Sequence, residues 1–138
     1  MCETRFYRCP ACDTVIGMIH DGGSPIYCCG AEMERLDVHG ADDPGAETHL
    51  PHASMDEYRI HITVGDQPHP MTAEHAIQWI YLQTDRGGQR KCLSGASHDK
   101  MKDDIETAGP TATFALADEH PRAVYAYCGR HGLWRKEL

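Results

Sequence analysis

Apolar and polar residues alternate strictly between Tyr58 and Val64. A period of two is typical of a β-strand with one buried face, and we predict that Tyr58, Ile60, Ile62 and Val64 form that face. Further short strands are expected at residues 76–83, 89–93, 111–116 and 123–128, with a hairpin turn at 84–88. Residues 99–107 are compatible with a helical turn. Short strands separated by turns predict an antiparallel sandwich or barrel.

Residues 1–36 have a different character, because short apolar stretches flank a turn rich in glycine and two pairs of cysteines. Cys9 and Cys12 are separated by two residues, and Cys28 is followed directly by Cys29. A segment this short cannot bury enough apolar surface to fold alone. Four thiolates around one metal ion would stabilise it, and a tetrahedral sulfur site takes either zinc or iron.

The overall composition restricts the possible partners and the compartment. The chain has 138 residues and a formal net charge of −8, and no basic stripe that would favour nucleic-acid binding is visible. No apolar run approaches the ~20 residues of a membrane span. The N-terminus lacks the pattern of a signal peptide, so we expect a cytoplasmic protein. In that compartment seven cysteines indicate metal ligands before disulfides.

A second set of candidate ligands lies between residue 49 and the C-terminus. It consists of His49, His69, His75, Cys128 and His131. Imidazoles with one thiolate suit iron or copper better than magnesium or calcium, and five ligands exceed the four of a closed zinc site. A square of imidazoles with one axial thiolate would leave a sixth position open, which indicates redox chemistry.

Six motifs, which together span nearly the whole chain, occur in an order that resembles the two-iron superoxide reductases called desulfoferrodoxins. They are residues 6–12, 28–33, 47–51, 68–71, 75–80 and 128–134. The resemblance implies a mainly β chain with three parts. A small rubredoxin- or desulforedoxin-like metal module (1–36) would be followed by a linker (37–46) and an immunoglobulin-like antiparallel β-sandwich (47–138).

The same resemblance implies the metal ligands. Cys9, Cys12, Cys28 and Cys29 would hold an iron or a zinc ion. In the sandwich, a non-haem iron would have His49, His69, His75 and His131 as equatorial ligands and Cys128 as its axial ligand. Glu47 matches the carboxylate that caps the vacant position when the iron is ferric.

The implied activity is an enzymatic one-electron reduction of superoxide to hydrogen peroxide, with a rubredoxin-like electron donor and a homodimeric assembly. One departure concerns Thr48, which stands where the family usually has a lysine that attracts superoxide. Thr48 keeps a hydroxyl group but no charge. We expect the cationic iron to supply most of the attraction, with Arg90 or Lys91 as candidate replacements for the missing charge.

A competing interpretation is a non-catalytic metal-binding or electron-transfer protein with structural zinc in the N-terminal site. A zinc-ribbon adaptor for nucleic acid is disfavoured by the net charge of −8. Among the remaining residues, Cys92 is expected to be a small buried side chain. Trp79 and Trp134 are expected to pack in the core, and His39 and His61 to have no role in the site.

Overall fold

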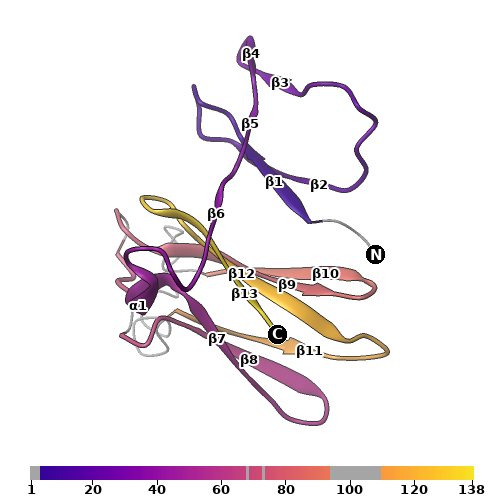
Figure 1. Cartoon of the computed structure of the whole chain (residues 1–138), viewed down its shortest axis with the longest axis vertical. Coiled ribbons are helices and arrows are strands. Elements are labelled where there is room, and N and C mark those ends of the chain that lie inside the picture. The colour runs from indigo at the N-terminus through magenta and orange to yellow at the C-terminus, as the bar shows by residue number, and fades with distance from the viewer. Residues whose placement is uncertain (1–3, 68, 73, 94–109) are drawn as a thin grey trace. The chain divides into compact units, whose positions relative to one another are not determined.

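The computed structural model describes residues 4–67, 69–72, 74–93 and 110–138. The chain is mainly β and divides into two compact units, Met1–Asp37 and Val38–Leu138 (Figure 1). We call them the N-terminal unit and the C-terminal unit. Within the described residues, no helix has the length and apolar character that a membrane crossing requires.

The N-terminal unit consists of five short strands. Its strands are β1 (Arg5–Arg8), β2 (Val15–Met18), β3 (Tyr27–Cys28), β4 (Ala31–Glu32) and β5 (Glu34–Arg35). Strand β1 lies between β2 and β5, and β3 pairs with β4 as a separate hairpin. The buried apolar side chains described here are only Phe6, Cys9 and Met33. So small a core is consistent with a unit that needs a metal ion to fold.

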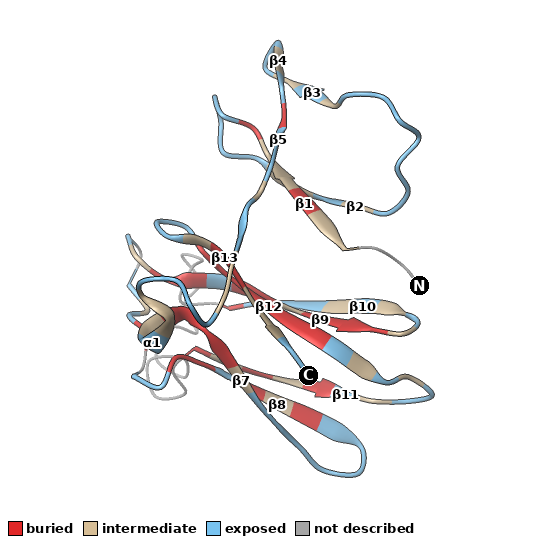
Figure 2. Ribbon diagram, viewed as in Figure 1, coloured by how far each residue is buried: buried red, intermediate tan, exposed pale blue. Residues whose placement is uncertain are grey.

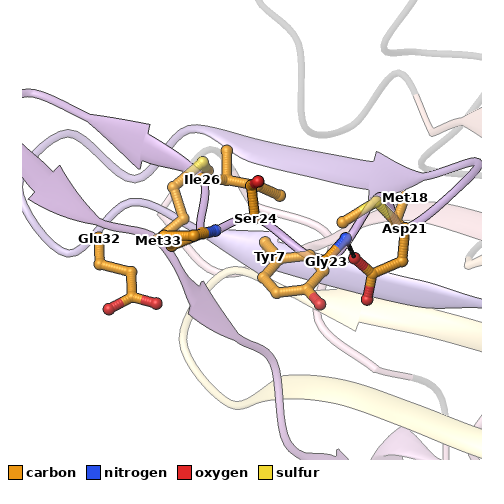
Figure 3. A pocket seen from close by; sticks show the side chains of 9 residues that line it. Tyr7, Met18, Asp21, Gly23, Ser24, Ile26, Glu32 and Met33 are labelled. Carbon is orange, nitrogen blue, oxygen red and sulfur yellow. Dashed lines mark hydrogen bonds between the residues drawn. The ribbon is translucent and has the colours of Figure 1, made fainter.

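A pocket of about 360 Å³ also lies in the N-terminal unit (Figure 3). Tyr7, Met18 and Met33 contribute to its lining, together with the carboxylates of Asp21 and Glu32. Asp21 accepts the backbone N–H of Gly23 at 2.7 Å. No cysteine lines this pocket, so it is distinct from the cysteine pairs of the same unit.

The C-terminal unit is a sandwich of two sheets. Its elements are β6 (Val38–His39), α1 (Ala46–His49), β7 (Pro51–Met55), β8 (Arg59–Val64), β9 (Ile77–Thr84), β10 (Gly87–Cys92), β11 (Thr111–Ala115), β12 (Pro121–Cys128) and β13 (Gly132–Glu137). One sheet has the order β10-β9-β12-β13-β6 and the other the order β11-β8-β7. The pairing is antiparallel except at the edge, where β6 runs parallel to β13.

The two sheets enclose one apolar core, which Figure 2 shows as the buried inner positions of their strands. The core combines Ile60, Ile62, Val64 and Phe114 from one sheet with Ile80, Leu82, Val124 and Ala126 from the other. Burying aliphatic and aromatic side chains of this size stabilises a fold by roughly 1.5–3 kcal/mol each. The core therefore gives the loops that emerge from these strands a rigid base.

All five predicted strands of this unit are present, each within two residues of its expected bounds. The predicted hairpin turn is confirmed as well, since Thr84 pairs with Gly87 across it. Two burial predictions were wrong. Tyr58 is 66% exposed because β8 begins only at Arg59, and Cys92 is exposed because it is the last residue of β10.

Four segments of regular structure in the described part of this unit were not predicted. They are β6, α1, β7 and β13. The expected linker, residues 37–46, contains β6 and the first residue of α1. The possible helical turn at 99–107 lies outside the described residues.

Candidate metal centres

Five ligand atoms from separate segments of the C-terminal unit converge on one point. We call His49, His69, His75, Cys128 and His131 the five-ligand group, and their ligand atoms all lie within 4.8 Å of one another. His49 ends α1, and His69 and His75 lie between β8 and β9. Cys128 ends β12, and His131 lies in the turn before β13. The sequence-predicted ligands of this group are thus brought together.

The four imidazoles are arranged as a square. His49 Nε2 lies 3.1 Å from His69 Nε2 and 3.1 Å from His131 Nδ1, which is in turn 3.1 Å from His75 Nε2. Half the diagonal of a square with such edges is about 2.2 Å, close to the ~2.0–2.1 Å of a metal–imidazole bond. The ring nitrogens therefore lie at the spacing that equatorial ligands of one metal ion require.

These contacts cannot all be hydrogen bonds. Nδ1 of His131 faces two imidazole nitrogens and lies 3.7 Å from Sγ of Cys128. A neutral imidazole has one N–H and one acceptor nitrogen, so three partners at a single nitrogen cannot all be satisfied by protons. A shared cation accounts for the convergence of these lone pairs.

Backbone carbonyls fix the orientation of two of the rings. Nδ1 of His49 donates to the carbonyl of Gly45 at 2.9 Å, and Nδ1 of His69 donates to the carbonyl of Pro70 at 2.7 Å. With the proton on Nδ1, the lone pair of Nε2 is free for a metal ion, as is usual for histidine ligands. Pro68, which precedes His69 in the sequence, lies outside the described residues.

Gly45 is required at the start of α1. Its φ of 93° is left-handed, and a Cβ there would lie 3.5 Å from Nδ1 of His49 and 3.7 Å from the ring of Trp134. Glycine adopts this conformation without steric cost. Gly65 has a similar role, since a Cβ there would lie 2.7 Å from the carbonyl oxygen of Thr48.

Trp134 supports two ligands of the square. Its ring stacks on that of His49 with centroids 4.9 Å apart and an interplanar angle of 19°. Its indole N–H donates to the carbonyl of His131 at 3.2 Å. Core packing was predicted for Trp134 and is confirmed by its 2% exposure, but its contact with two ligand residues was not predicted.

Burial keeps His49, His69 and His75 in the neutral form that binds metal. Burial, together with neighbouring imidazoles that disfavour a second positive charge, lowers the pKa of His69 to about 4. Burial also lowers the pKa values of His49 and His75. Protons therefore compete only weakly with a metal ion near neutral pH.

Glu47 and Thr48 lie beside this group but do not belong to it. Glu47 is exposed in the only turn of α1, and its backbone carbonyl accepts the N–H groups of Asp66 and Gln67. The hydroxyl of Thr48 lies 3.2 Å from the carbonyl of Gly45 and 3.0 Å from Nδ1 of His49. Thr48 therefore contacts the side of the His49 ring that faces away from the square.

The two cations suggested as replacements for a lysine have other contacts. Arg90 donates to Sγ of Cys92, and Lys91 donates to the carbonyl of Thr113. A different cation acts on the five-ligand group, because the positive charge of Arg130 contributes to the lowered pKa of His75. Arg130 is exposed and lies between two ligands in the sequence, which is the signal that could have identified it.

The N-terminal unit holds a second group, formed by Cys9, Cys12, Cys28 and Cys29, whose sulfur atoms lie within 4.8 Å of one another. Sγ of Cys28 is 3.7 Å from Sγ of Cys12 and 3.9 Å from Sγ of Cys29. A tetrahedron with metal–sulfur bonds of about 2.3 Å has edges of about 3.8 Å. The four sulfurs therefore fit one tetrahedral metal ion.

The backbone at the adjacent cysteines is unusual. Cys29 has a φ of 54° and Gly30 a φ of 74°, so two consecutive residues are left-handed. This conformation costs a non-glycine residue about 1–2 kcal/mol. This left-handed backbone occurs where two neighbouring residues direct their thiols into one cluster of sulfur atoms.

The thiols influence each other strongly. A hydrogen bond with Thr14 lowers the pKa of Cys12 to about 6, while hydrogen bonds with the thiols of Cys9 and Cys12 raise the pKa of Cys28 to about 12. Four thiolates so close together would repel each other unless a cation compensates their charge.

The chain is mainly β and contains a four-cysteine unit and a sandwich that carries the five-ligand group. These features define a class of protein with two candidate metal centres. The desulfoferrodoxin family model matches residues 42–137, which include the whole five-ligand group. This chain belongs to the desulfoferrodoxin family.

Individual relatives extend the similarity to the N-terminal unit. The desulfoferrodoxin of Syntrophotalea carbinolica is 34% identical over 135 residues, covering 98% of this chain and 97% of that protein. The superoxide reductase of Pyrococcus horikoshii is 35% identical over 114 residues, covering 77% of this chain and 97% of that protein. The crystal structure of the superoxide reductase from Treponema pallidum covers 99% of this chain and 98% of that one, with 27% identity and a TM-score of 0.75. These relatives support an oxidoreductase role, and the family implies iron centres.

We expect Cys9→Ser to unfold the N-terminal unit. Structural tetrathiolate metal sites contribute about 10–16 kcal/mol to folding, which exceeds the stability of a unit with three buried apolar side chains. Hydrogen exchange should show loss of protection in β1 and β2 with strands β8, β9 and β12 unchanged. Cys92→Ser, which removes an exposed thiol outside the group, is the control and should leave both units protected.

We also expect the protein prepared without metal to lose stability as the pH falls from 6.5 towards 4. Between the ordinary pKa of 6.5 and the folded value of about 4, the unfolded chain binds a proton at His69 that the folded chain excludes. The loss should be about 3 kcal/mol at the acid end of this window. Urea unfolding followed by tryptophan fluorescence reports the C-terminal unit, which contains both tryptophans. His69→Gln should flatten the dependence, and an unchanged slope in that variant would contradict this assignment.

Proposed function

We propose that this protein is a superoxide reductase, in which one superoxide anion, one electron and two protons yield one hydrogen peroxide. The observation that carries the proposal is the square of four imidazoles, in which three nitrogen–nitrogen edges are 3.1 Å, beside the sulfur of Cys128. Five protein ligands would leave a six-coordinate metal ion with one position available to a substrate. The superoxide reductases among the relatives support the same activity.

The residues of this chain have separable roles in the proposal. His49, His69, His75, His131 and Cys128 would hold a non-haem iron. Bound iron would supply the electron, and a thiolate among its ligands would increase the electron density at the metal. Cys9, Cys12, Cys28 and Cys29 would hold a second iron or a zinc ion in a folded metal module.

The square has one buried edge and, opposite it, one more exposed edge. His49 and His69 are buried, whereas His75 is half-buried and His131 is exposed. The edge formed by His75 and His131 is therefore the one that solvent and a small anion reach. Arg130, which is exposed next to this edge, adds positive charge there.

Glu47 and Thr48 are proposed to assist from the side of α1. Glu47 carries an exposed carboxylate whose charge reaches His49, since burial lowers the pKa of that ring and the charge of Glu47 opposes part of this lowering. Such a carboxylate could cap the open position. The contacts of Thr48 favour a role in holding His49 over a role in attracting the substrate.

Oxidation of the iron-loaded protein tests whether the five-ligand group binds iron through a thiolate. Iron-loaded protein should gain a broad long-wavelength absorption band on mild oxidation, and Cys128→Ser should lack this band because the band requires a sulfur ligand. The parent should consume superoxide with formation of hydrogen peroxide and without release of oxygen. Cys92→Ser serves as the control for loss of a thiol. An iron-loaded parent without the band would support the non-catalytic alternative, in which the protein only binds metal or transfers electrons.

Arg130 is expected to attract superoxide to the exposed edge of the square. Arg130→Gln should slow the capture of superoxide roughly two- to fivefold at low salt, because one charge near the exposed edge of the square is removed. The dependence of the rate on ionic strength should weaken as well. Arg90→Gln is the matched control, since Arg90 contacts Cys92 instead. Pulse radiolysis measures both rates, and equal slowing by the two variants would argue against a specific role of Arg130.

A further inference from the structure

Trp134 lies between two histidines, of which only one belongs to the five-ligand group. On one side its ring stacks on His49, with centroids 4.9 Å apart. On the other side the ring of His39 lies 5.0 Å away at an angle of 38°. Trp134 is buried, and His39 is half-buried. A continuous row of three aromatic rings therefore leads from a buried ligand towards the surface.

The fold fixes the outer end of this row through strand pairing. Strand β6 runs parallel to β13, and the register places His39 beside Trp134. Gly132 has a φ of 83°, and a Cβ there would lie 3.6 Å from Nε2 of His39. Glycine at this position thus permits the left-handed turn before β13, and the His39 ring lies within van der Waals contact of it.

The outer end of the row lies on an edge strand. Strand β6 is the last strand in the order of the five-stranded sheet, and its Val38 is 47% exposed. It is also the first element of the C-terminal unit, directly after Asp37 at the end of the N-terminal unit. His39 is therefore the second residue of the C-terminal unit in the sequence.

Building on the function proposed above, we propose that the row His39–Trp134–His49 is the path by which an electron enters the five-ligand site. One electron would pass along this row from the ferrous form of an iron–tetrathiolate donor to a ferric ion held by the five-ligand group, and no bond would be formed or broken. Electron tunnelling decays less steeply through rings in contact than across gaps. Entry through a buried ligand also keeps the exposed edge of the square available to superoxide.

A purely structural role of the row makes a different prediction. Residues that only orient a ligand act on the metal itself, and their loss typically costs about 10–100-fold in metal affinity. Such a loss would also change the absorption of the ferric site and would slow every reductant alike. An electron path affects only those donors that cannot reach the iron from the open side.

The test follows reduction of the oxidised, iron-loaded protein in a stopped-flow instrument, using decay of the long-wavelength band. His39→Ala should slow reduction by reduced rubredoxin several-fold. Reduction by ascorbate, a small molecule that can enter from the exposed edge, should be unchanged. Iron content and the band should equal those of the parent. His39→Phe should restore the rate because it returns an aromatic ring, and His61→Ala, which removes a half-buried histidine of β8, should have no effect.

Two iron–tetrathiolate centres are candidate donors of the electron. One is rubredoxin, and the other is the four-cysteine site of this chain. Repeating the experiment with redox-inactive zinc in the four-cysteine site separates them. A lower parent rate would assign the donor to that site, and an unchanged rate would assign it to rubredoxin. In both cases His39→Ala must remain slow for the proposal to stand.

The proposal fails if His39→Ala matches the parent with both reductants, or if ascorbate and rubredoxin are slowed equally. A parent without any band on oxidation would instead contradict the proposed function. The two failures are therefore distinguishable.

Discussion

The segments that carry the five-ligand group depend on one local constraint, which is that four imidazole nitrogens and a thiol sulfur share a volume that protons alone cannot satisfy. Ring nitrogens 3.1 Å apart, with their lone pairs directed at a common centre, are unfavourable unless a cation binds. The surrounding chain holds this arrangement in place. Carbonyls of Gly45 and Pro70 bind the outer nitrogens of two rings, and Trp134 supports a third residue through its backbone.

The same constraint explains the unequal burial of the ligands. Buried imidazoles stay neutral at low pH and are held by fixed backbone groups, as the pKa of about 4 for His69 illustrates. Exposed ligands leave an approach for an anion. In this square, the buried residues are His49 and His69, and the more exposed residues are His75 and His131. The same group thus has ligands that stay neutral and a side that an anion can approach. A fully buried square would block the substrate, whereas a fully exposed one would lose the low dielectric that strengthens charge interactions.

Much of this arrangement could be predicted from the sequence, because ligand types and strand periodicity are local signals. The alternation at residues 58–64 and the spacing of Cys128 and His131 can be recognised without knowledge of the fold. Contacts that depend on strand pairing could not be predicted. His39 lies in a polar stretch that resembles a linker, and only its pairing beside Trp134 gives it a place near the site. Likewise, only the fold shows that Arg90 contacts Cys92, whereas the position of Arg130 between two ligands is visible in the sequence.

The replacement of a charged residue by Thr48 is consistent with this division of roles. A lysine at that position would bring its charge to α1, on the buried side of the square, where the hydroxyl of Thr48 instead contacts Gly45 and His49. The positive charge of Arg130 acts at the other edge, on the half-buried His75. Attraction of the anion and support of the buried ligands would then be assigned to different segments, the turn after β12 and the start of α1. Because these segments are far apart in the sequence, each can change without disturbing the ligand that the other one holds.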